Sequence, residues 1–60
     1  MDNQLLRATY FVGDINAAIA FYRDALGLTV TEDRVIEDQG VRGVLLQIGG
    51  SEIELLEPTR

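Results

Sequence analysis

The sequence contains no cysteine and no histidine among its 60 residues. Without cysteine no disulfide can stabilise the fold, and without histidine a common ligand of protein-bound metals is missing. A chain of this length forms one domain at most and buries only about 60% of the surface that its unfolded form exposes. We therefore expect a small core and a partner subunit.

Positive charge is also scarce. Five basic residues, all of them arginine, stand against ten acidic ones, which gives a formal net charge of −5. Because such a surface repels a phosphate backbone, nucleic acid is not expected as a partner. No apolar run approaches the roughly 18 residues that span a bilayer, and the start of the sequence lacks the basic residues of a signal peptide. We expect a cytoplasmic protein without a membrane partner.

One stretch, residues 12–28, has the pattern of a helix. Asp14 can accept hydrogen bonds from the amides of a first turn, and Gly27 can supply the left-handed residue that ends a helix. The apolar residues between them recur at helical spacing, namely Ile15, Ile19, Tyr22 and Leu26, with Ala18, Phe21 and Ala25 beside them. The pattern predicts a helix with one broad apolar face that must be covered.

The remaining segments are typical of strands and turns. Residues that favour strands are dense at 5–12, 28–35, 41–48 and 51–57, and the pair Gly49-Gly50 is typical of a hairpin turn. The charged segment 37–40 is expected to turn, and Pro58 to close the last strand. The order βαβββ predicts an α+β fold, in which residues 1–60 form a single module with a mixed four-stranded sheet and one helix on one face.

Alternation along these strands separates two faces of the sheet. The face toward the helix is expected to hold Leu6, Ala8, Tyr10, Val12, Val44, Leu46, Ile48, Ile53 and Leu55. The hydroxyl groups of Tyr10 and Tyr22 are expected at the edge of this core rather than in catalysis. The opposite face, called the mixed face here, is expected to hold Arg7, Thr9, Phe11, Gly43, Leu45, Gln47, Glu54 and Leu56. Such a face suits a cavity wall or an interface better than open solvent.

Four stretches in this order, 12–14, 21–28, 38–42 and 52–58, resemble the vicinal oxygen chelate superfamily of glyoxalases, bleomycin-resistance proteins and extradiol dioxygenases. The last two are most similar to the amino-terminal half of methylmalonyl-CoA epimerases. The resemblance implies two βαβββ modules around a small-molecule cavity. A single module then implies a homodimer or a higher homo-oligomer, in which a second copy supplies the same residues.

The resemblance also implies a divalent metal, such as manganese, cobalt, nickel, magnesium or zinc, bound by the first and fourth strands. Glu54 stands at the fourth-strand position, but the first-strand position, usually histidine, is Arg7, which has no lone pair to offer. The catalytic glutamate of the epimerases corresponds to Gly43. These two departures predict that metal-dependent isomerase or lyase chemistry is impaired, and no catalytic residue is assigned.

Three functions stay open. Glu54 can ligate a metal in an active epimerase or lyase, or it can pair with Arg7 in an ion-pair cluster that needs no metal, and we favour the cluster. A glycine inside a strand leaves room on its face, which suits a module that binds a hydrophobic small molecule between Phe11, Leu45 and Leu56. The third possibility is a reduced or engineered half-barrel that only assembles.

Overall fold

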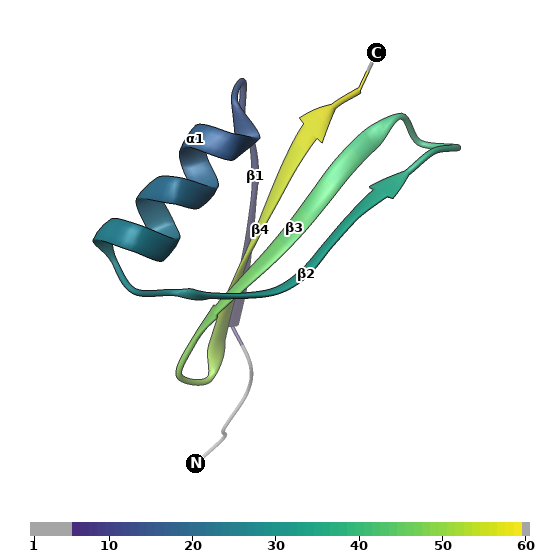
Figure 1. Ribbon diagram of the computed structural model, residues 1–60. Coiled ribbons are helices and arrows are strands. Elements are labelled where there is room, and N and C mark those ends of the chain that lie inside the picture. Colours follow the sequence, from purple (N-terminus) through teal and green to yellow (C-terminus); the bar gives the residue numbers. More distant parts are fainter. Residues whose placement is uncertain (1–5, 60) are drawn as a thin grey trace.

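The computed structural model describes residues 6–59, which form a four-stranded sheet with one helical segment on one side (Figure 1). The predicted βαβββ order and α+β fold are confirmed. The elements are β1 (Leu6–Phe11), α1 (Ile15–Ala20), η1 (Phe21–Ala25), β2 (Thr29–Ile36), β3 (Val41–Ile48) and β4 (Ser51–Pro58). Leu5, with which the first strand was expected to begin, and the side chain of Leu6 lie outside what the structure describes.

The strands lie side by side in the order β1-β4-β3-β2. β1 runs parallel to β4, whereas the pairs β4–β3 and β3–β2 are antiparallel. The predicted turn between β3 and β4 contains Gly49, whose φ of 57° is a left-handed conformation that glycine adopts without a steric penalty. The first and last strands of the module are therefore neighbours, so residues far apart in the sequence meet on the sheet.

The helical segment begins after Asp14, as predicted. Oδ1 of Asp14 accepts a hydrogen bond from the amide of Ala17 at 3.1 Å, and Gly27, with a φ of 77°, follows the end of the segment. Regular α-helix stops at Ala20, because residues 21–25 form a π-turn in which the Leu26 amide donates to the Phe21 carbonyl at 3.3 Å. This wider turn rotates later side chains away from the 3.6-residue repeat. Leu26, expected on the apolar face, is therefore exposed, and Phe21, the first residue of the π-turn, is exposed as well.

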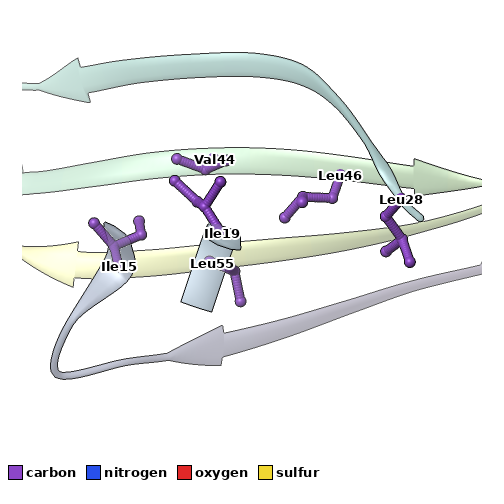
Figure 2. Packing of buried hydrophobic residues seen from close by; sticks show 6 residues of the cluster. All are labelled: Ile15, Ile19, Leu28, Val44, Leu46 and Leu55. Carbon is purple, nitrogen blue, oxygen red and sulfur yellow. The ribbon is translucent and has the colours of Figure 1, made fainter. Parts of the chain in front are cut away.

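The core lies between the helical segment and the sheet (Figure 2). Six side chains are buried there: Ile15, Ile19, Leu28, Val44, Leu46 and Leu55. Tyr22 packs against this cluster, but Tyr10 and Ile48, which were expected in it, are 51% and 54% exposed. Tyr10 lies on the edge strand β1 and Ile48 ends β3, so the short helical segment does not cover them. Among the described residues no helix is long and apolar enough to cross a membrane.

The cap at Asp14 gives a direct test of the helix boundary. Replacing it by alanine (Asp14→Ala) removes the acceptor for the Ala17 amide and should lower the free energy of unfolding by about 1 kcal/mol. Asp14→Asn keeps a side-chain oxygen at this position and should retain most of the stability. Urea denaturation of the three proteins measures both effects, and equal losses for the two variants would contradict a capping role.

Candidate functional site

The face of the sheet opposite the helical segment carries the predicted mixed face. The strand register places its residues in rows that run across the sheet: Thr9, Glu54, Leu45 and Glu32 form one row, and Phe11, Leu56, Gly43 and Arg34 form the next. The helical segment packs on the other side, so within residues 6–59 no element covers this face (Figure 1). Phe11 is accordingly 71% exposed.

The mixed face contains a hollow of about 160 Å³, called the central hollow below. It is lined by Arg7, Glu32, Arg34, Ile36, Gly43, Leu45 and Glu54. Four residues predicted from the sequence therefore converge on it, namely Arg7, Gly43, Leu45 and Glu54. The other four, Thr9, Phe11, Gln47 and Leu56, lie in the rows of the same face but do not line the hollow.

Gly43 lines the central hollow and is itself buried. A Cβ added to it would lie 3.4 Å from Cδ2 of Leu56 and 3.9 Å from Cδ1 of Ile36, which are ordinary contact distances. The space over this glycine is therefore about one methyl group wide, between two apolar neighbours. The sequence analysis expected the glycine to leave room on its face, and in one module that room is limited to this space.

The residues of β2 in the hollow were missed by the sequence analysis, which assigned none of them to the mixed face. The β2–β3 register shifts between Val30 and Glu32, so that Thr31 has no cross-strand partner. This β-bulge reverses the alternation. Val30 is the cross-strand partner of Leu46, which faces the helix, whereas Glu32 is the partner of Leu45, which lies on the opposite face. Strict alternation from Val30 would have placed Glu32 toward the helix, and no local signal in the sequence marks the bulge.

The ion pair at the site differs from the expected one, because Arg7 pairs with Glu52 and not with Glu54. Nη2 of Arg7 lies 2.7 Å from Oε1 of Glu52, and Nε donates to the same oxygen at 2.9 Å. Oε1 of Glu54 instead accepts from the hydroxyl of Thr9 at 3.0 Å. The parallel register explains both contacts, since Arg7 lies opposite Glu52 and Thr9 opposite Glu54. Hydrogen bonding to Glu52 also raises the pKa of Arg7, which keeps the guanidinium charged.

The side chains of this face do not fit the metal site that the resemblance implies. The first-strand position is the guanidinium of Arg7, which cannot ligate a cation. One carboxylate oxygen of Glu54 already accepts a hydrogen bond from the hydroxyl of Thr9. Nowhere in the described part of the chain do three or more His, Cys, Asp or Glu side chains form a group that could hold a metal ion. The donor set of one module is therefore too small for a divalent cation.

A second polar cluster lies on the helix side of the sheet. Arg42 donates to both carboxylate oxygens of Asp33, at 3.0 and 2.8 Å, and to Oδ1 of Asn16 at 2.9 Å. Oε2 of Glu57 accepts from the amide of Ile15 at 3.2 Å. These contacts join β2, β3 and β4 to the start of α1. Because its polar groups contact one another, we assign this cluster a structural role.

The Arg42–Asp33 pair predicts that the free energy of unfolding falls slightly at low pH. The two hydrogen bonds from Arg42 lower the pKa of Asp33 in the folded state below its unfolded value of about 4. The ion pair therefore contributes to the free energy of unfolding above about pH 4, and this contribution is lost as the pH falls through the folded-state pKa of Asp33. Because 43% of the Asp33 side chain is exposed, we expect a loss of about 0.5 kcal/mol.

Chemical denaturation at pH 6 and at pH 2.5 measures this contribution. The decrease in unfolding free energy from pH 6 to pH 2.5 should be smaller in Asp33→Asn than in the original protein. Arg42→Gln removes the donor and should reduce the decrease by a similar amount. An unchanged decrease in both variants would show that the pair does not contribute to acid sensitivity.

Three comparisons with known proteins bear on the site. The family model described as the Glyoxalase/Bleomycin resistance protein/Dioxygenase superfamily matches residues 4–59. The mitochondrial methylmalonyl-CoA epimerase of mouse is 40% identical over 47 residues. Among solved structures, a hypothetical protein of Bacillus halodurans has a TM-score of 0.84 at 35% identity. A variant of the Streptomyces coelicolor methylmalonyl-CoA epimerase, in complex with 2-nitronate-propionyl-CoA, has a TM-score of 0.81 at 36% identity.

These matches cover most of the present chain but less than half of each relative. The aligned part is 78% of this chain and 26% of the mouse protein. It is 95% of this chain in both structural comparisons, against 41% of the Bacillus chain and 44% of the Streptomyces chain. The described βαβββ unit therefore corresponds to less than half of each solved relative.

Proposed function

Because this chain belongs to the Glyoxalase/Bleomycin resistance protein/Dioxygenase superfamily, we propose that it is a half-domain whose mixed face packs against a second copy of itself. The two copies enclose a small-molecule cavity around the central hollow. The metal-dependent isomerase or lyase chemistry of an epimerase or glyoxalase is impaired in this cavity.

The proposal rests on the mixed face. A sheet covered on one side leaves Phe11 largely in solvent, and Ile36 and Leu45 in the hollow are only partly buried. Covering such a surface with a second apolar layer is favourable by about 25 cal/mol per Å² of apolar area. A two-fold axis brings the same face of both copies together, so each copy supplies what the other lacks.

The impairment rests on a single observation, the ion pair of Arg7 with Glu52 at 2.7 Å. The guanidinium at the first-strand position offers a divalent cation no lone pair, and its ion pair occupies the carboxylate of Glu52, which could otherwise be a ligand. Glu54 remains as a carboxylate on this face, but its Oε1 accepts from Thr9. The cavity of a pair of modules is therefore suited to organic ligands and not to a metal ion.

The substitution Arg7→His tests this assignment. It replaces the charge by an imidazole, so two copies would present two imidazoles and two Glu54 carboxylates, a donor set that binds cobalt or zinc. At a Co²⁺ concentration 100 times the dissociation constant, the variant should gain about 2.7 kcal/mol of stability. The melting temperature of the original protein should not respond to Co²⁺.

Arg7→Gln is the matched control, because it removes the charge without adding a strong ligand, and it should not respond to Co²⁺ either. A rise in melting temperature of the original protein equal to that of Arg7→His would show that Arg7 does not impair metal binding.

A further inference from the structure

The central hollow has polar groups on its two sides, with Gly43 and Leu45 of β3 between them. Arg34 lies on β2 and Glu54 on β4, with Gly43 of β3 between these strands. Two strand spacings of about 4.8 Å separate β2 from β4, and Glu54 lies two residues, or about 7 Å, along the strands from the row of Arg34, so the backbones of the two polar residues are roughly 12 Å apart. Their side chains border a gap whose apolar neighbours are Ile36 and Leu45.

The polar groups retain hydrogen-bonding capacity. Nε of Arg34 lies 2.9 Å from Oε2 of Glu32, but no side-chain hydrogen bond within residues 6–59 uses the guanidinium of Arg34. Oε1 of Glu54 accepts from Thr9, while its Oε2 accepts from no side chain in the same range. A donor for a carboxylate thus stands on one side of the gap, and an acceptor for an ammonium group on the other.

The charges that line the hollow balance. Arg7 and Arg34 are positive, and Glu32 and Glu54 are negative. A ligand with a single charge meets repulsion as well as attraction in such a lining, which reduces its gain in binding energy. A zwitterion can satisfy groups of both signs, and a short aliphatic body can contact Leu45.

We propose that the central hollow binds a small aliphatic amino acid. Its carboxylate would contact Arg34, its ammonium group would donate to Oε2 of Glu54, and its aliphatic carbons would lie against Leu45. This ligand class rests on the proposed function, in which a second module closes over the hollow and excludes water.

Isothermal titration with four probes of similar size tests the charge pattern. 2-Aminobutyrate carries both charges, 2-hydroxybutyrate replaces the ammonium group by a hydroxyl, butyrate has only the carboxylate and butylamine only the ammonium group. 2-Aminobutyrate should bind about tenfold more tightly than each of the other three, since one charge-assisted contact is lost in each case. Equal affinities, or no binding of any probe, would overturn the assignment.

Variants assign the contacts to residues. Glu54→Gln should weaken 2-aminobutyrate about tenfold and leave butyrate nearly unchanged, whereas Arg34→Gln should weaken both. Arg23→Gln, at an exposed site on the helical segment paired with Asp24, is the control and should change neither. The mass of each sample, measured by light scattering, separates this inference from the proposed function. All lining residues belong to one module, so loss of binding overturns the amino-acid site, while a monomeric mass overturns the dimer.

Discussion

Replacing Leu55 by alanine (Leu55→Ala) is expected to remove most of the stability of this protein. Leu55 lies in the middle of β4 with 0% of its surface exposed, between the helical segment and the sheet (Figure 2). Truncating a fully buried leucine costs about 2–5 kcal/mol, because apolar contacts are lost and a cavity remains. A chain of this size has a total stability of roughly 3–9 kcal/mol. Because the core formed by the described residues contains only six buried side chains, the loss cannot be spread over many neighbours.

Val35→Ala provides the comparison for this prediction. Val35 is an aliphatic strand residue like Leu55, but it is 53% exposed, so its truncation should change the unfolding free energy by at most about 0.5 kcal/mol. Circular dichroism during urea denaturation measures both variants. Similar losses in the two variants would show that the core does not lie where Leu55 is buried.

A charge at Phe11 is expected to separate the two copies. Phe11 is 71% exposed in a single module, so Phe11→Glu leaves the core of that module unchanged. In the proposed dimer the same position is covered by the partner, and loss of an aromatic contact with burial of a charge costs at least about 2 kcal/mol. The dissociation constant of the dimer should therefore rise at least about 30-fold.

Phe21→Glu is the matched control for the dimer. Phe21 is also an exposed phenylalanine, but it lies in η1 on the helix side of the sheet. The same change of residue there should leave the dissociation constant as it is. Sedimentation equilibrium over a range of concentrations measures both variants, and equal weakening by the two substitutions would exclude the mixed face as the specific interface.

The fold could be predicted because its signals are local. Asp14 and Gly27 mark the ends of the helical segment, Gly49 the hairpin turn, and the strand pattern between residues 41 and 48 matches β3. The π-turn after Ala20 could not be predicted in this way. It changes the helical repeat without a proline or glycine among residues 21–25 to mark it, and it turns Leu26 away from the core.

The site was predicted only in part, for reasons that lie in the sheet register. Alternation along β1, β3 and β4 was enough to place Arg7, Gly43 and Glu54 on one face. The partner of Arg7 depends on how β1 and β4 align, which single strands do not reveal. The contribution of Arg34 depends on the bulge at Thr31, which reverses the faces of β2.

The absolute mass in solution tests most directly whether the mixed face is covered by a second copy. Size-exclusion chromatography with multi-angle light scattering should give twice the 6.6 kDa of one chain across the whole peak. Hydroxyl-radical footprinting of the same sample should find Phe11 protected and Phe21 reactive. A mass of 6.6 kDa at high protein concentration, with Phe11 as reactive as Phe21, would contradict the account.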